Sequence, residues 1–196
     1  MNFCILGIGN SGDEYEKTRH NTGFILLDQF AKNHDLEFVL KKHAYIATFS
    51  FRSHNFYLLK PTTFVNLSGV ALRYWMEKLK VEIENVLVVV DDIHLDLGNI
   101  RFRNSGSSGG HNGLKNIALN LGSENYKRLR VGIGHGFTSG HQADYVINNF
   151  TDEELKKILS LSPILEDITK SLVEQNENIK TKIINDAIAK LKNKEE

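Results

Sequence analysis

The chain has 196 residues, 24 basic and 24 acidic side chains, and a single cysteine. This length fits one domain, residues 1–196, with a sizeable core. One cysteine excludes an internal disulfide and suits a reducing compartment. The sequence shows neither a signal-peptide pattern nor an apolar run of the roughly 18 residues that span a membrane, so we expect a cytoplasmic protein. Because the net charge is zero, any surface for nucleic acid must be local.

The amino-terminal part predicts a strand, a glycine turn and a helix. Residues 3–6 are an apolar strand, and the glycine-rich residues 7–12 follow as a turn. The first apolar stripe at helical spacing begins at Phe24, so the helix starts near Asn21 or Thr22. His20 therefore lies just before a helix and beside a glycine turn at a strand's carboxyl end, where open α/β sheets place their chemistry.

Further along, residues 44–51 alternate as a strand, and residues 56–60 are its predicted hairpin partner. Ser68 is the expected N-cap of a helix with apolar residues at helical spacing. The β-branched run of residues 86–90 predicts a strand buried on both faces of a parallel sheet. The remaining predicted elements are strands at 100–103 and 128–133, a short helix at 114–121, and a tail of two or three helices over 151–196, with Thr151 as a cap and Pro163 between two of them. We thus expect an α/β fold with a twisted mixed, largely parallel sheet flanked by helices.

Three familiar kinds of site find little support. Gly7, Gly9 and Gly12 match a dinucleotide-binding pattern, but an acidic stretch follows where a helix N-terminus should hold the pyrophosphate. Ser108 matches G-x-S-x-G, yet it lacks the strand before and the helix after that a nucleophile elbow requires. A zinc motif such as H-E-x-x-H is missing from the sequence, so we expect no metal and no cofactor.

A histidine–aspartate pair is the favoured chemistry. Asp91 ends the buried strand, and a carboxylate there is costly unless it has a partner. His20 is the natural candidate, because the aspartate would fix its tautomer and leave its other nitrogen to take a proton from water. Residues 101–135 carry six basic side chains and one acidic one, a net charge of +5, which predicts a local basic patch beside a glycine-rich loop.

Several motifs together resemble the bacterial peptidyl-tRNA hydrolase family. They keep their order and spacing over residues 3–150. The motifs are Gly7-Ile8-Gly9-Asn10-Ser11-Gly12, Tyr15 with Thr18-Arg19-His20-Asn21, Lys60 to Gly69, Asp91-Asp92, Gly109-Gly110-His111-Asn112-Gly113-Leu114, Arg128 to Gly134, and the element at residues 145–150. The resemblance implies hydrolysis of the ester between a peptide and the 3′-terminal ribose of tRNA, without metal or covalent intermediate.

The resemblance also implies roles for particular residues. His20 is the general base, Asp91 orients and charges it, and Asn10 holds the substrate and His20 in place. The implied substrate-binding residues are Tyr15, Asn21, Phe64, Asn66 and Asn112. Arg101, Arg103 and Arg130 are the implied ligands of tRNA phosphate, and the protein is expected to act as a monomer on the acceptor stem and CCA end of peptidyl-tRNA.

Three positions depart from the family pattern. Ser11 stands where proline is usual, Val65 where methionine is common, and His94 where aspartate is frequent. None of these changes removes a proposed catalytic group, but they leave open the shape of the loop after Asp91. The alternative function is a catalytically idle relative that binds tRNA or the ribosome through the same basic surface.

Overall fold

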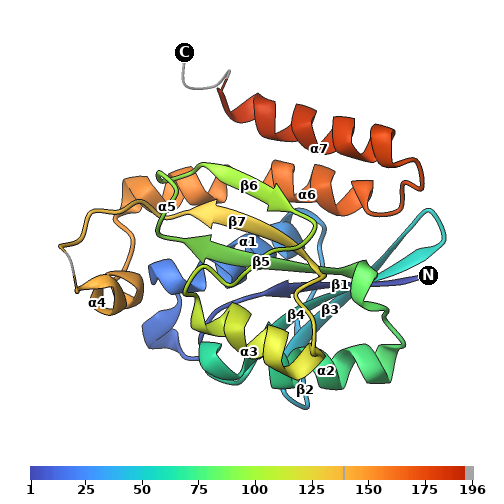
Figure 1. Ribbon diagram of the computed structural model, residues 1–196, viewed down its shortest axis with the longest axis horizontal. Coiled ribbons are helices and arrows are strands. Elements are labelled where there is room, and N and C mark those ends of the chain that lie inside the picture. Colours follow the sequence, from blue (N-terminus) through green and yellow to red (C-terminus); the bar gives the residue numbers. More distant parts are fainter. Residues whose placement is uncertain (139, 193–196) are drawn as a thin grey trace.

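The computed structural model describes residues 1–138 and 140–192. A seven-stranded mixed sheet lies between two layers of helices (Figure 1). Its strands, in the spatial order of the sheet, are β2 (Val39–Lys41), β3 (Ala44–Phe51), β4 (His54–Pro61), β1 (Asn2–Gly7), β5 (Val86–Asp92), β7 (Lys127–Gly132) and β6 (Ile100–Arg103). The pairs β4–β1, β1–β5 and β5–β7 are parallel, whereas the outer pairs are antiparallel. The predicted α/β class with a mixed sheet is confirmed.

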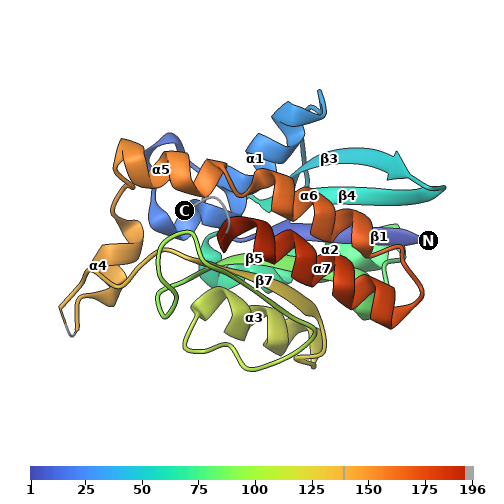
Figure 2. The same ribbon diagram turned by 90° about the horizontal axis from the view of Figure 1, so that it is seen from above.

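Helices cover both faces of the sheet. The helices are α1 (Thr22–Asn33), α2 (Ser68–Leu79), α3 (Asn112–Leu121), α4 (Gln142–Ile147), α5 (Asp152–Leu159), α6 (Ser162–Ser171) and α7 (Glu177–Lys192). The apolar sides of α1, α5 and α6 pack with α7 on one face of the sheet, while α2 and α3 pack on the other (Figure 2). Every residue of β5 is buried, as its unbroken apolar run predicts. None of the helices in the described residues is long and apolar enough to cross a membrane.

Local sequence signals explain where several helices begin. The Thr151 hydroxyl accepts a hydrogen bond from the Glu154 backbone nitrogen, and the Glu154 carboxylate accepts one from the Thr151 backbone nitrogen. A full capping box therefore starts α5, as expected. The prediction for Ser68 is wrong: the helix begins at Ser68 itself, whose hydroxyl donates to the Val65 carbonyl at 2.8 Å. Pro163 lies in the first turn of α6, where its missing N–H costs no helical hydrogen bond.

Close packing at Gly23 brings the start of α1 against the ends of two strands. A Cβ at this position would lie 2.4 Å from the Ile8 nitrogen and 2.5 Å from the Val89 carbonyl oxygen. A residue with a side chain therefore cannot occupy it without moving the helix away from the sheet. The glycine thus fixes the distance between the turn that carries His20 and strand β5, which carries Asp91.

Candidate active site

His20 lies in a short 3₁₀ turn, Arg19–Asn21, between the glycine turn and α1. Asn21 ties this turn to the glycine turn: its side-chain oxygen accepts from the Asn10 backbone nitrogen and its amide donates to the Asn10 carbonyl, both at 2.9 Å. Thr22 adds a bond from its hydroxyl to the Arg19 carbonyl at 2.7 Å. These buried local bonds hold His20 on a rigid segment at the carboxyl edge of the sheet.

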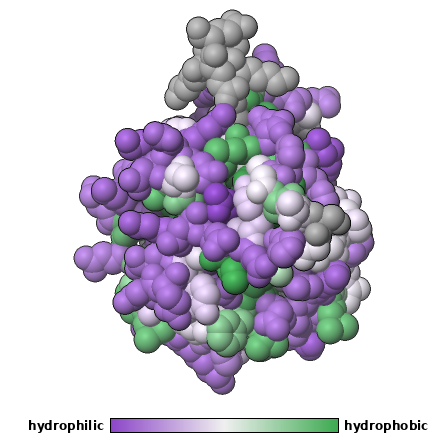
Figure 3. Space-filling model, turned by 90° about the vertical axis from the view of Figure 1, so that its left-hand side faces the viewer, coloured by the Kyte–Doolittle hydropathy of each residue, from purple (hydrophilic) through white to green (hydrophobic). Residues whose placement is uncertain are grey.

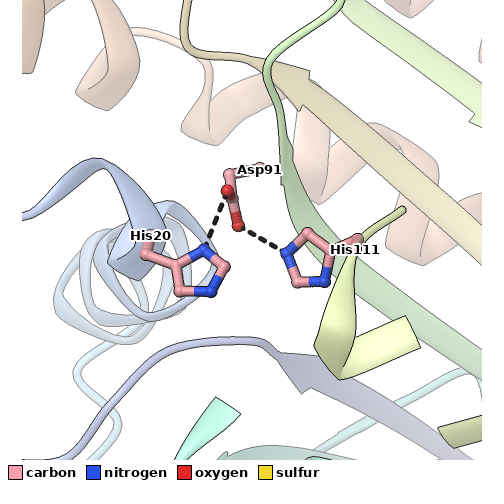
Figure 4. A group of neighbouring side chains, drawn as sticks. All are labelled: His20, Asp91 and His111. Atoms are coloured by element: carbon pink, nitrogen blue, oxygen red, sulfur yellow. Dashed lines mark hydrogen bonds and ion pairs between the residues drawn. The ribbon is translucent and has the colours of Figure 1, made fainter. Parts of the chain in front are cut away.

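Asp91 lies between two histidine rings (Figure 4). His20 Nδ1 is 2.9 Å from one carboxylate oxygen, and His111 Nε2 is 3.0 Å from the other. The Asp91 side chain is 2% exposed, and those of His20 and His111 are 15% and 12% exposed. The predicted His20–Asp91 pair is present, and His111 is a second partner that the sequence argument did not assign.

The hydrogen-bond pattern fixes the tautomer of His111. Its Nδ1 accepts from the backbone nitrogens of Gly113 at 3.1 Å and Leu114 at 3.4 Å, and so caps the N-terminus of α3. A ring nitrogen that accepts carries no proton, so Nε2 carries it and donates to Asp91. Both nitrogens of His111 are therefore engaged, and His111 is not free to act as a base.

The same reasoning assigns His20. The carboxylate of Asp91 is an acceptor, so His20 Nδ1 carries a proton and donates it to Asp91. In the neutral ring the other nitrogen, Nε2, then holds a free lone pair. His20 is thus the member of the trio that can remove a proton from a water molecule.

Charge and burial act together on these groups. Burial alone would lower the pKa of His20, but the negative charge of Asp91 and the hydrogen bond to it outweigh burial and raise the pKa. Burial would raise the pKa of Asp91, yet attraction to His20 and His111 and their hydrogen bonds hold it well below its usual range. Asp91 stays ionised, and His20 is made a stronger base than an ordinary histidine.

His20, Asp91 and His111 also lie close enough to offer ligand atoms to one metal ion. Their geometry is instead that of a hydrogen-bonded chain, since the atoms that face each other are already paired as donor and acceptor. A metal between them would have to replace the proton on His20 Nδ1 and the proton on His111 Nε2. The three side chains can therefore transfer a proton as they stand, whereas metal binding would first require the loss of these two protons.

A cavity of about 560 Å³ opens beside the trio. Its lining includes His20, Asp91, His111, Asn112, Arg130 and residues of α4. Figure 3 shows the molecule from the α4 side, where hydrophilic side chains cover most of the surface and apolar ones form small separate clusters. The cavity is large enough for a nucleoside-sized group and joins basic and apolar walls at the reactive histidine.

The other predicted site residues fall into two groups. Asn10 and Asn21 are buried, and their hydrogen bonds position the chain. Asn10 Oδ1 accepts from the Val65 nitrogen at 3.0 Å, which anchors the segment that carries Asn66. Phe64, Asn66 and Asn112 are exposed, and Tyr15 is half-buried. In the structure Asn21 thus serves to join two backbone segments, whereas the exposed residues are available to a ligand.

The arginines of the basic patch differ in what they can bind. Arg101 pairs in register with Arg130, and Arg103 with Arg128, so the four side chains leave the β6–β7 ribbon on one face. Arg101 and Arg103 are exposed, but Arg130 Nε lies 2.8 Å from Asp92. Arg128 is 1% exposed and donates to the carbonyls of Ser107 and Glu124, so its charge holds the glycine-rich loop instead of adding to the patch.

The role of His111 and the helix α4 are features of the structure that the sequence did not predict. A signal for His111 was present, because a histidine directly before a helix can cap it, but its second nitrogen could be paired only with knowledge of β5. Helix α4 has only six residues, Gln142–Ile147, too few for an apolar periodicity that would indicate a helix from the sequence.

The fold and the site together define an α/β protein in which an aspartate-supported histidine faces an open cavity. The profile of the peptidyl-tRNA hydrolase family matches residues 4–195. The chain belongs to this family.

Individual relatives agree with that assignment. A peptidyl-tRNA hydrolase of Bacteroides fragilis is 47% identical over 171 residues, 87% of this chain and 91% of the relative. One from Cytophaga hutchinsonii is 49% identical over 158 residues, 81% and 84% of the two chains. The crystal structure of the Acinetobacter baumannii peptidyl-tRNA hydrolase superposes with a TM-score of 0.82 at 26% identity, covering 95% of this chain and 94% of that one.

Proposed function

We propose that the protein hydrolyses the ester bond between a peptide, or an N-blocked amino acid, and the 3′-terminal ribose of tRNA. Such a reaction recycles peptidyl-tRNA that ribosomes release early. The observation that carries the proposal is the Asp91–His20 pair at an open cavity, in a chain of the peptidyl-tRNA hydrolase family. The protein is proposed to work as a cytoplasmic monomer.

His20 is the general base of the proposed reaction. Its Nε2 removes a proton from a water molecule, and the oxygen of that water attacks the ester carbonyl. Asp91 stabilises the imidazolium that forms, and His111 holds Asp91 in place while it caps α3. The proton on Nε2 then passes to the 3′ oxygen of the ribose as the ester bond breaks, so His20 returns to its neutral form. An aminoacyl ester is intrinsically labile, and a positioned water therefore suffices without a metal or a covalent intermediate.

The exposed amides beside the cavity are the proposed ligands of the ester and the peptide. Asn112 starts α3 next to His111, where its amide and the helix N-terminus favour negative charge that develops on the carbonyl oxygen. Asn66 is placed by the bond from the Val65 nitrogen to Asn10 and is proposed to bind the peptide backbone. Tyr15 and Phe64 offer apolar surface for the peptide, and Phe64 is 62% exposed.

Arg101, Arg103 and Arg130 are the proposed ligands of tRNA phosphate. Guanidinium groups on one face of a two-stranded ribbon can take several oxygens of the acceptor stem at once. Arg130 lines the same cavity as His20, and its ion pair with Asp92 directs the guanidinium under Gly109. The phosphate contacts thus lie beside the place proposed for the CCA end.

The alternative is an idle relative that binds tRNA without cleaving it. The intact Asp91–His20–His111 chain favours the enzyme, because binding alone needs no such arrangement. The test is incubation of the purified protein with N-acetyl-aminoacyl-tRNA, followed by separation of free tRNA from N-acetyl amino acid. Release of both products at a rate proportional to enzyme supports the proposal, and tight tRNA binding without release supports the alternative.

A further inference from the structure

Arg19, the residue before His20, directs its positive charge into the protein. It is 8% exposed, and its guanidinium donates to the backbone carbonyls of Asn148 at 3.3 Å and Asn149 at 2.8 Å. Its Nη2 also pairs with Glu154 at 2.8 Å, and the guanidinium lies over the Tyr145 ring, 4.4 Å from the centroid. A buried cation requires such compensation, and here one segment, residues 145–154, supplies it.

That segment overlaps α4, which forms part of the lining of the cavity beside the trio. Ala143, Val146 and Ile147 of α4 line the cavity, yet α4 has six residues and none of them is buried. Tyr145 and Val146 pack against the core at their partly buried sides, and the Tyr145 hydroxyl donates to the Ile133 carbonyl at 2.7 Å. The residues that directly follow α4 are fixed by Arg19, through the two carbonyl bonds and a backbone bond from the Arg19 nitrogen to the Asn148 carbonyl at 3.1 Å.

The contacts of Arg19 also reach the start of the next helix. The same Glu154 oxygen that pairs with Arg19 also accepts a hydrogen bond from the Thr151 backbone nitrogen, in the capping box of α5. One guanidinium thus joins the turn that carries His20, the end of α4 and the first turn of α5. A movement of α4 relative to His20 must break several of these bonds together.

We propose that Arg19 is a positioning residue that sets the α4 wall of the cavity at a fixed place relative to His20. This inference rests on the proposed function, because the wall matters if the ester end of the substrate lies between α4 and His20. Arg19 itself does not touch the reacting atoms. Its loss should loosen substrate placement and leave the ionisation of His20 unchanged, since the bond from His20 to Asp91 does not involve Arg19.

The test compares Arg19→Met with Arg73→Met, which removes an exposed arginine from an ion pair on α2. With N-acetyl-aminoacyl-tRNA, Arg19→Met should lower kcat/KM by roughly 10- to 100-fold, mainly through KM, because displaced walls misplace the substrate. The pH at which activity rises should stay at the wild-type value. Arg19→Lys should recover part of the loss, since lysine keeps the charge but lacks the planar fork.

Chemical rescue separates positioning from general stability. Methylguanidinium added to Arg19→Ala, below denaturing concentrations, should lower KM, and methylammonium at the same concentration should not. The proposal would be overturned if Arg19→Met, at temperatures where this variant is folded, had the same KM as the wild-type protein. A shift of its pH profile from that of the wild type would overturn it as well.

Amide hydrogen exchange tests the inference independently of activity. Residues 142–149 should exchange faster in Arg19→Met than in Arg73→Met, because the anchor of α4 is lost. Unchanged exchange there would overturn the role of Arg19. A wild-type protein that fails to cleave the substrate would refute the proposed function instead, so the two failures are distinguishable.

Discussion

The tautomers of His20 and His111 predict how the substitution Asp91→Asn changes activity. His111 Nε2–H must face an acceptor, because its Nδ1 is committed to the backbone of α3. The asparagine oxygen will therefore face His111, and its NH₂ group will face His20. His20 Nδ1 must then accept, which moves the proton to Nε2 and removes the base. The amide thus holds the ring in the wrong tautomer, the outcome known from the Asp-to-Asn change in serine proteases.

The magnitude follows from the cost of the opposite orientation. Turning the amide would place its NH₂ group against His111 Nε2–H and leave buried donors unpaired, at about 1–3 kcal/mol. This corresponds to a factor of roughly 5 to 150 in favour of the inactive tautomer. The tautomer alone should therefore lower kcat of Asp91→Asn by about 5- to 150-fold. Loss of the charge that stabilises the imidazolium should lower kcat further, toward the roughly 10⁴-fold effect of the same change in serine proteases. Asp91→Ala, which permits both tautomers, should be less impaired than Asp91→Asn.

The assay is single-turnover hydrolysis of N-acetyl-aminoacyl-tRNA as a function of pH. Activity requires neutral His20 and so rises with pH through the pKa of His20. Burial lowers that pKa, but the charge of Asp91 and the hydrogen bond to it together raise it by more. Removing both in Asp91→Ala should therefore move the rise in activity to lower pH. In the double variant Asp91→Asn with His111→Ala, the amide is free to turn and activity should recover relative to Asp91→Asn. Two results together would refute the tautomer assignment: Asp91→Asn is more active than Asp91→Ala, and adding His111→Ala to Asp91→Asn does not change its activity.

Two further predictions concern the RNA contacts and the kind of catalysis. Arg101→Ala and Arg103→Ala should each raise KM for full-length substrate and leave kcat nearly unchanged. Each should also reduce the slope of log affinity against log salt concentration by about one. If either variant loses kcat on a short substrate without the 5′ phosphate, that arginine takes part in the reaction itself. Ser108→Ala, or prolonged dialysis against a chelator, should leave turnover within about twofold of wild type, because neither a serine nor a metal takes part in the proposed step; loss of most activity on dialysis would point to a metal at His20, Asp91 and His111.

Much of the fold could be predicted because its strands and caps have strong local signals. The apolar run of β5 and the alternation in β3 each specify one burial pattern, and the acidic first turn after Thr151 specifies a capped helix. The three exposed residues Val39–Lys41 form an edge strand whose pairing comes from β3, and α4 is held by contacts made across the fold. Such elements depend on tertiary partners more than on their own sequence.

The sequence predicts only the part of the site in which the chemistry of one residue requires a particular partner. Asp91 is one of the last two residues of a buried strand, so its charge needs a partner, and this pointed to His20. The second partner, His111, depends on how α3 meets β5, and the burial of Arg128 depends on a loop carbonyl and the Tyr126 ring, 4.3 Å from its guanidinium carbon. Charge counted along the chain does not distinguish a buried arginine from an exposed one.

Replacement of His20 tests the central claim most directly. His20→Asn keeps a polar side chain of similar reach but provides no base, and tRNA binding should stay within threefold of wild type. Single-turnover hydrolysis of N-acetyl-aminoacyl-tRNA, measured with enzyme in excess, should fall by roughly 10²- to 10⁴-fold, the usual contribution of a general base. Hydrolysis by His20→Asn within threefold of the wild-type rate would contradict the assignment of His20 as the group that activates water.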